Sequence, residues 1–191
     1  MLAVDLLITE HRLIERGIAV LTKQRDRLNA GGALDTELME IVVDFTRTYA
    51  DRTHHGKEEE ILFRDLGKKP LSAQLRRTTD DLVLEHAHIR NRVTQLVAAK
   101  ELYLKGSREA LRKVIEVLNE LLVYYAAHIE KEEKHFFQPA MEYFTDEEKA
   151  RMSAEMKEYD SRIIHEKYTR IIEALEQRGL SDCGQPRPPH R

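Results

Sequence analysis

The chain has 191 residues, of which 41% are hydrophobic, and this supports a single well-formed core. Lys and Arg total 31 against 34 for Asp and Glu, a formal net charge of -3 that disfavours binding to nucleic acid. The single cysteine, Cys183, excludes an intrachain disulfide framework, a cysteine-ligated zinc ribbon and a four-cysteine iron–sulfur cluster. This cysteine usage predicts a cytoplasmic protein. Without a run of about 18 apolar residues or a signal peptide, the sequence also predicts a soluble chain with no membrane partner.

Charged residues make up 34% of the chain, which contains only 8 glycines and 5 prolines, and this composition favours helices. Apolar residues recur every three or four positions, which is the period of a helix. The first such stripe covers residues 4–21, is interrupted by His11, and is followed by a pair of glycines. The second covers residues 41–66, and its inner face becomes polar at His55 and Glu59 before a glycine and a proline end it.

The third and fourth helices repeat this combination of an apolar stripe and inward polar residues. The third begins after Ser72, or about two turns later, and carries His86 in its apolar row. The fourth covers residues 111–135 and carries His128 and Glu132 on its inner face, with a proline just beyond its end. Short connections make successive helices antiparallel neighbours.

The predicted fold is therefore all-α, an up-down-up-down antiparallel four-helix bundle over residues 1–144 with an additional C-terminal helix. Thr145 and Glu148 form a capping box that starts this fifth helix, predicted over residues 145–178. Its broad apolar face is expected to pack on the bundle or on a partner, either another protein or a second copy. Residues 179–191 have the composition of a disordered tail.

Six polar side chains occupy inward positions, where burial costs several kcal/mol unless they are paired or bound to metal. They are His11, His55, Glu59, His86, His128 and Glu132. The rise of a helix places all six at a similar depth, provided that the third helix begins late enough. Four imidazoles and two carboxylates without a thiolate suit iron, manganese or zinc. Six ligands fit two metal ions bridged by the glutamates.

Other polar residues near these positions allow more than one interpretation. His54 lies off the stripe, so we expect it in solvent rather than behind the ligands. Tyr125 either packs in the core or donates a hydrogen bond to a metal-bound ligand. Arg90 either neutralises a bridging carboxylate or guards the cavity, or it points outward and pairs with a neighbouring helix. His165 is expected to have no role.

Four segments in this order resemble the hemerythrin-like (HHE cation-binding) family, whose bundle holds a non-haem diiron centre. They are Glu10-His11-Arg12-Leu13-Ile14, residues 54–63 beginning His54-His55, Glu85-His86 with Arg90 four later, and residues 128–133 beginning His128. The resemblance covers residues 5 to 140. It implies that the six inward residues ligate two iron ions, with a carboxylate or oxo bridge.

One departure from the family concerns Arg90, where oxygen-carrying hemerythrins have a second histidine. A guanidinium is a poor metal ligand, so the resemblance does not extend to reversible oxygen carriage. The ligand set is more similar to that of the family's iron-centre repair proteins, which relate to nitrosative stress. The expected function is to bind or sense O2, NO or iron. The alternatives are a diiron enzyme that acts on peroxide or ferrous iron or repairs iron centres, and a bundle with a vestigial site.

Overall fold

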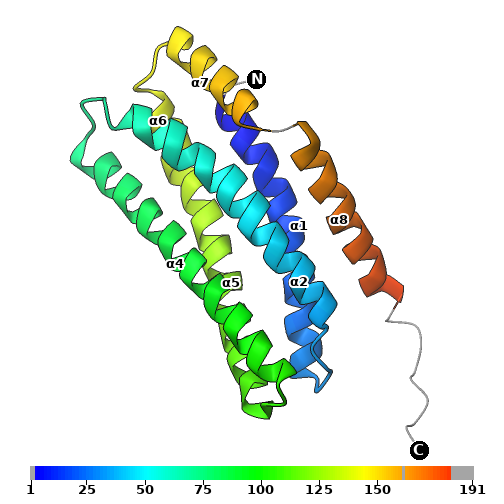
Figure 1. The fold of residues 1–191 in the computed structure, drawn as a ribbon. Coiled ribbons are helices and arrows are strands. Elements are labelled where there is room, and N and C mark those ends of the chain that lie inside the picture. Colours follow the sequence, from blue (N-terminus) through cyan, green and yellow to red (C-terminus); the bar gives the residue numbers. More distant parts are fainter. Residues whose placement is uncertain (1–2, 161, 182–191) are drawn as a thin grey trace, which may run out of the picture.

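The structure is a computed structural model that describes residues 3–160 and 162–181. Every regular element in these ranges is helical, which confirms the predicted all-α chain (Figure 1). Segments labelled η are π-helical, with wider turns than an α-helix. In chain order the elements are α1 (Ala3–Asn29), α2 (Thr36–Phe45), η1 (Thr46–His55), η2 (Glu58–Phe63), α3 (Arg64–Leu66), α4 (Ala73–Leu104), α5 (Arg108–Lys131), η3 (Glu132–Phe136), α6 (Phe137–Met141), α7 (Asp146–Tyr159) and α8 (Arg162–Ser181).

Four long helical runs lie side by side and form a helical bundle (Figure 1). The first is α1, the second runs from α2 to α3, the third is α4, and the fourth runs from α5 to α6. Gly31 has a φ of 83°, which lets the chain reverse after α1 at the predicted place. Helix α4 takes the earlier of its two predicted starts, because the Ser72 hydroxyl accepts a hydrogen bond from the Leu75 amide at 3.1 Å.

The predicted end of the fourth helix before Pro139 is wrong. Pro139 lies inside α6, which continues directly from η3. The helical geometry is interrupted three residues before the proline, at Phe136, where φ is -117° and the run changes from η3 to α6.

Two apolar clusters fill the bundle, and a polar layer separates them. On α1, for example, Leu7 belongs to one cluster and Ile14 to the other, with the buried His11 between them. The same order holds on α4, where Leu82 and Ile89 flank the buried His86. Apolar burial on both sides of the layer stabilises the bundle and holds its polar side chains away from water.

The C-terminal region contains two helices where one was predicted. The capping box of Thr145 and Glu148 starts α7 as expected, but the chain leaves helical geometry at Asp160, whose ψ is 122°. The Asp160 carboxylate contacts Lys57 in the bundle, at 2.7 Å. Helix α8 continues to Ser181, so it includes the first residues of the predicted tail, and residues 182–191, with Cys183, lie outside the described residues.

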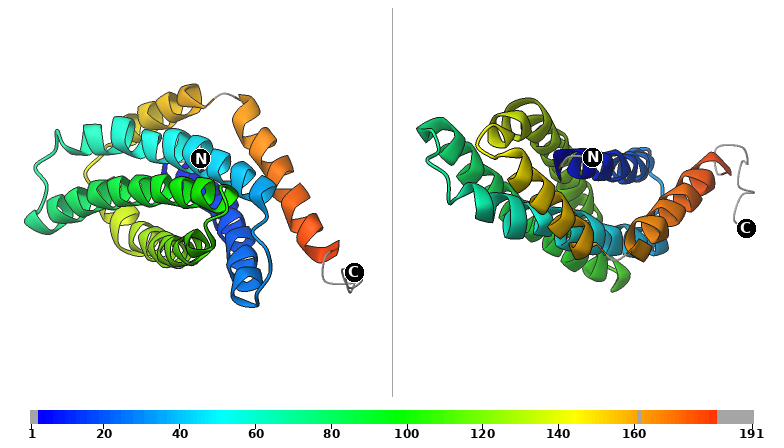
Figure 2. Two further views of the ribbon diagram at one scale, coloured as in Figure 1. Left: turned by 60° about the horizontal axis from the view of Figure 1, so that its bottom comes forward. Right: turned by 90° about the horizontal axis from the view of Figure 1, so that it is seen from above.

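Helix α8 packs on its own bundle, on the side away from α4 and α5 (Figure 2). Tyr168 is fully buried, and its ring lies edge-on to Phe45 and tilted against Tyr49. Ile172 and Leu175 are buried in the same apolar cluster. Of the helices that the structure describes, none is long and apolar enough to cross a membrane.

Candidate metal centre

The second helical run carries its functional residues on π-helical turns. Segments η1 and η2 flank Gly56 and Lys57, so the run is wider than an α-helix over two adjoining stretches. Such turns occur frequently at functional sites. Because a wider turn rotates less per residue, His54 and His55 both face the interior, each with 1% of its side chain exposed, and Glu58 is fully buried.

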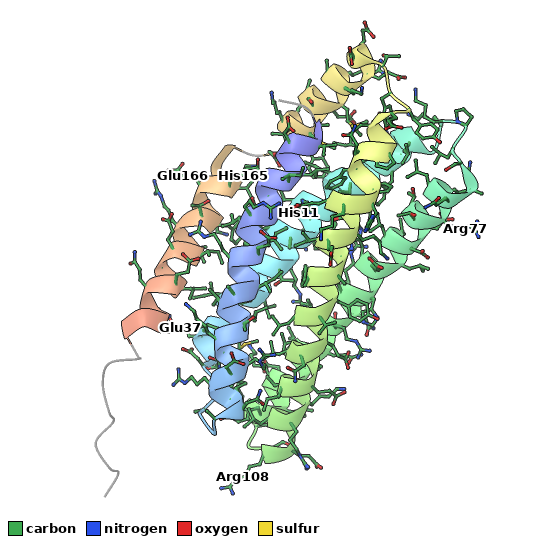
Figure 3. The ribbon with its side chains drawn as sticks, turned by 180° about the vertical axis from the view of Figure 1, so that it is seen from behind. His11, Glu37, Arg77, Arg108, His165 and Glu166 are labelled. Atoms are coloured by element: carbon green, nitrogen blue, oxygen red, sulfur yellow. The ribbon has the colours of Figure 1, made fainter. Side chains whose placement is uncertain are left out.

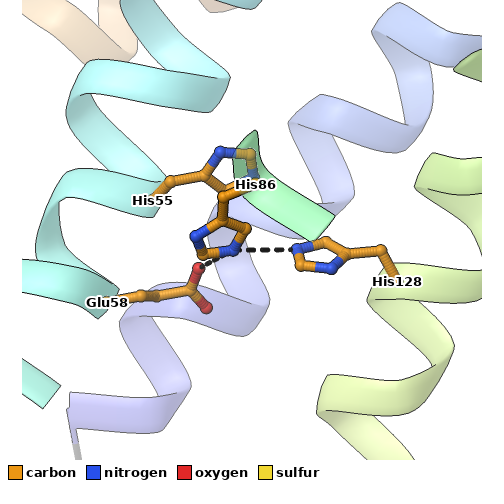
Figure 4. Close-up of side chains that lie close together, drawn as sticks. All are labelled: His55, Glu58, His86 and His128. Carbon is orange, nitrogen blue, oxygen red and sulfur yellow. Dashed lines mark hydrogen bonds and ion pairs between the residues drawn. The ribbon is translucent and has the colours of Figure 1, made fainter. Parts of the chain in front are cut away.

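One group of ligand atoms comes from α4, α5 and the second run. It contains His55, Glu58, His86 and His128, and we call it the three-histidine cluster (Figure 4). The Nε2 atoms of His86 and His128 are 3.2 Å apart, and Glu58 Oε2 lies 3.4 Å from His86 Nε2. The rings of His55 and His86 stack with their centroids 3.9 Å apart. Atoms this close can bind one metal ion together.

A second group lies beside the first. It contains His11, His54, Glu58 and Glu132, and we call it the two-histidine cluster. His11 Nε2 is 3.2 Å from Glu132 Oε2, and His54 Nε2 is 3.7 Å from Glu58 Oε1. All four side chains are buried.

Two carboxylates face both clusters. Glu58 directs Oε1 at His54 and Oε2 at His86. Glu132 directs Oε2 at His11 and Oε1 at His128, with the latter atoms 3.3 Å apart. Each carboxylate therefore offers one oxygen to each cluster, which is the arrangement of a carboxylate that bridges two metal ions.

Every inner imidazole has a carboxylate at its other nitrogen. The Nδ1 atoms lie 2.6–3.4 Å from these oxygens, in the pairs His11–Glu133, His54–Glu10, His55–Asp51, His86–Glu59 and His128–Glu85. An Nδ1–H that donates to a carboxylate fixes the ring and leaves Nε2 as the acceptor that a metal needs. In its neutral form each of the five rings therefore keeps its proton on Nδ1 and leaves Nε2 free for a metal ion.

Arginine and lysine side chains pair with the carboxylates that contact the Nδ1 atoms. Arg90 donates to Asp51 at 2.7 Å and to Glu59 at 2.8 Å, so it supports the partners of two inner histidines. Arg12 donates to Glu133, and Lys131 pairs with Glu85. Arg90 is therefore an ion-pair partner of the neighbouring second run, as one of the predicted roles had it, and none of its ion pairs among the described residues is with Glu58 or Glu132.

The crowded carboxylates control the protonation of the imidazoles. Burial opposes a charge on His11, but Glu132 and Glu58 outweigh it and raise its pKa to about 9. The pKa of His86 rises to about 11, because Glu132 and Glu58 outweigh its burial too. His55 has a pKa well below its usual value, since it is buried and lies beside other imidazoles. The free site therefore holds protons where cations would bind.

The donor set fits buried metal ions. Apart from the inner imidazoles, at 3.2–3.9 Å, no group among the described residues satisfies the oxygens of Glu58 and Glu132. Two fully buried carboxylates that only imidazoles face fit cations that the chain itself does not supply.

Comparison with protein families agrees with this geometry. The model of the hemerythrin HHE cation-binding domain matches residues 77–183, more than half of the chain. The chain belongs to the hemerythrin HHE cation-binding family. Membership in the family indicates binding of a metal cation, typically iron.

The family match covers only part of the metal centre. Three of the seven inner residues, His86, His128 and Glu132, lie within the matched range, and the other four precede it. Comparison with curated proteins gives no match, and comparison with solved structures gives none either. The placement of the N-terminal ligands thus rests on the geometry described above.

The structure brings five of the six predicted residues into the two clusters and leaves Glu59 outside. Glu59 is at the edge of the bundle with 28% of its side chain exposed, and Glu58 takes the inner position. His54, expected in solvent, is also inside. The prediction assumed α-helical turns, whereas the π-helical turns of η1 and η2 shift the inner face by about one residue.

A repeat in the sequence carried the missing information. Residues 54–59 and 128–133 both read His-x-x-Lys-Glu-Glu. Aligning the two segments matches His54 with His128 and Glu58 with Glu132. In each segment the structure brings the histidine next to the glutamate four residues later. His55 has no counterpart in this repeat and supplies the fifth imidazole.

Proposed function

We propose that the two clusters bind a pair of non-haem iron ions. The three-histidine cluster binds one ion and the two-histidine cluster binds the other, with Glu58 and Glu132 bridging them. The observation that carries this proposal is the division of each buried carboxylate between the clusters. Imidazole and carboxylate ligands without a thiolate favour iron over copper(I).

The proposed fold of this centre is the up-down-up-down four-helix bundle of residues 1–144, with α7 and α8 packed on it. Five imidazoles and two shared carboxylates do not fill every coordination position of two metal ions, so a position would remain open for a small ligand. Arg90 cannot act as a metal ligand, and a fifth imidazole makes up the number of ligands in its place. This is possible because the adjacent residues His54 and His55 each belong to one of the two clusters. We also propose a cytoplasmic location, because a chain with a single cysteine cannot form an intrachain disulfide.

The proposed activity is binding or sensing of O2 or NO. A small apolar cavity lies between α1 and the second run. Its lining supports a diatomic ligand, because O2 and NO are small, uncharged molecules that an apolar cavity can hold. Ile14, Gly17, Phe45 and Tyr125 line it, and the buried Tyr125 hydroxyl has no partner among the described residues. When bound, a reduced iron pair would supply binding of such ligands or electron transfer to them, and the chain's own residues exclude water and orient the imidazoles.

Absorption spectroscopy of the reduced, iron-loaded protein tests this function. We expect the visible spectrum to change on addition of NO and on exposure to air, and metal-free protein treated in the same way to show no change. A reduced, iron-loaded protein whose spectrum responds to neither gas contradicts the proposal. Sustained consumption of peroxide by iron-loaded protein, without a spectral response to NO, assigns the enzymatic alternative instead.

A further inference from the structure

The two halves of the centre share one outer arrangement of three residues. In the half built by α4 and α5, Glu85 Oε2 accepts from His128 Nδ1 at 2.9 Å, and its other oxygen pairs with Lys131. This arrangement is open to solvent, since 22% of the Glu85 side chain and 33% of the Lys131 side chain are exposed.

The half built by α1 and the second run repeats the arrangement in a buried form. Glu10 Oε2 accepts from His54 Nδ1 at 2.9 Å, and Oε1 pairs with Lys57. Here Glu10 is 3% exposed and Lys57 is fully buried. A buried ammonium costs several kcal/mol unless its donors are satisfied, so Lys57 needs more than one partner.

The junction between α7 and α8 supplies the second partner. Lys57 Nζ lies 2.7 Å and 2.9 Å from the two carboxylate oxygens of Asp160. His165, at the start of α8, is 3.0 Å from Asp160 through Nε2 and 2.9 Å from the Tyr49 hydroxyl through Nδ1. Figure 3 shows His165 on the side of α8 toward α1, the helix that carries His11.

Glu10, Asp160 and His165 lie close enough together to hold a cation of their own. Lys57 already places its ammonium between the two carboxylates. The cluster is therefore balanced within the chain, unlike Glu58 and Glu132, and its chemistry fits orientation of His54 better than binding of a third metal ion.

We propose that Asp160 is a positioning residue for the two-histidine cluster, acting through Lys57 and Glu10 on His54. The inference rests on the proposed dinuclear function. Asp160 anchors Lys57, Lys57 orients Glu10, and Glu10 fixes the ring that directs Nε2 at the second ion. The three-histidine cluster does not use this chain of contacts, because Asp51, Glu59 and Glu85 hold its rings.

Loss of the Asp160 charge should lower the affinity for one of the two ions only, the ion at the two-histidine cluster. In Asp160→Asn, Lys57 keeps Glu10 as its single carboxylate partner, so Glu10 is drawn away from His54 and a net positive charge remains near the second ion. Loss of such outer partners typically weakens metal binding about 10- to 100-fold. We expect this loss for the second ion and an unchanged affinity for the first.

Titration of the metal-free protein with cobalt(II) tests the proposal. The unmodified chain should bind two ions, and Asp160→Asn should bind the second at least about ten-fold more weakly. Asp160→Glu, which keeps the charge, should restore most of the affinity. Proton NMR adds a local readout, since the shifted Nδ1–H signal that His54→Gln removes should also be lost or broadened in Asp160→Asn.

Glu155→Gln provides the control on α7, the helix that ends just before Asp160, because Glu155 pairs with Arg64 at the surface and has no hydrogen bond or ion pair with Lys57 among the described residues. We expect it to bind both ions as the unmodified chain does. If Asp160→Asn binds both ions equally more weakly, or binds both with the affinity of the unmodified chain, the inference about Asp160 is overturned and the dinuclear function is not. An unmodified chain that binds no second ion overturns the dinuclear function itself.

Discussion

Glu58 and Glu59 are adjacent residues with different roles at the metal centre. Glu58 lies between the two clusters without a hydrogen-bond donor among the described residues, whereas Glu59 accepts from His86 and Arg90 at the edge of the bundle. The first is placed to contact metal and the second to hold an imidazole.

Glu58→Gln should therefore reduce bound iron from about two ions per chain to one or fewer, because an amide cannot bridge two cations. Glu59→Gln should keep both ions with about 10-fold weaker binding, since it only loosens the ring of His86. Iron content and competition with a chelator measure both effects. The reverse order of sensitivity would mean that the inner face follows the α-helical register after all.

Proton release on metal binding follows from the raised pKa values of His11, about 9, and His86, about 11. At pH 7.5 both rings are protonated in the metal-free protein, and each must lose its proton to bind metal, so loading should release about two protons. Calorimetry in buffers of different ionisation enthalpy counts them. Loading without proton release contradicts these protonation states.

The same two histidines make the metal-free protein less stable in alkali. Their pKa values in the folded chain lie above the unfolded value of 6.5, so their stabilising effect is complete below that pH. It is lost progressively as the pH rises above about 6.5, and is gone above about pH 9 for His11 and above about pH 11 for His86. Urea unfolding of metal-free protein should show a falling free energy of unfolding over this range, while metal affinity rises. A stability that is flat over this range would contradict the sign.

At the scale of elements, the helical period predicted more of the fold than of the site. Apolar stripes, the Ser72 cap and the capping box at Thr145 marked the helices, because burial and caps act through local sequence. The π-helical turns of η1 could not be predicted in this way, because they depend on packing among helices and do not change the spacing of apolar residues in the sequence. A shift of one residue there was enough to exchange Glu58 for Glu59.

The break at Asp160 escaped prediction for a similar reason. Residues 146–178 read as one amphipathic stretch, and only the contact of Asp160 with Lys57 shows why the chain turns there. Lys57 itself gave no signal, because a lysine in a charged segment is normally solvated.

Helix α4 allows a test of the packing beside the centre with one substitution at two positions. Leu82 is fully buried and Leu84 is 67% exposed. Leu82→Ala should lower the free energy of unfolding by about 2–5 kcal/mol through loss of apolar burial and a cavity. Leu84→Ala should change it by about 0.5 kcal/mol or less. Urea unfolding measures both, and equal effects would contradict the orientation of α4.

For the whole molecule, metal binding and folding are coupled. Each ion that binds only the folded chain stabilises it by about 3–4 kcal/mol when the metal is 100- to 1,000-fold above its Kd. For a chain of this size that corresponds to a Tm about 5–15 °C higher for each ion bound. Calorimetry before and after chelation measures the difference. An unchanged Tm after verified metal removal would show that the inner carboxylates do not share buried ions.

Anomalous diffraction from crystals of the iron-loaded protein tests the dinuclear centre most directly. The map at the iron edge should contain two peaks about 3.5–4 Å apart, the usual spacing of two-metal sites. One peak should lie against the three-histidine cluster and the other against the two-histidine cluster, with Glu58 and Glu132 between them. A single peak, or two peaks that leave Glu58 without contact to either, would contradict the account.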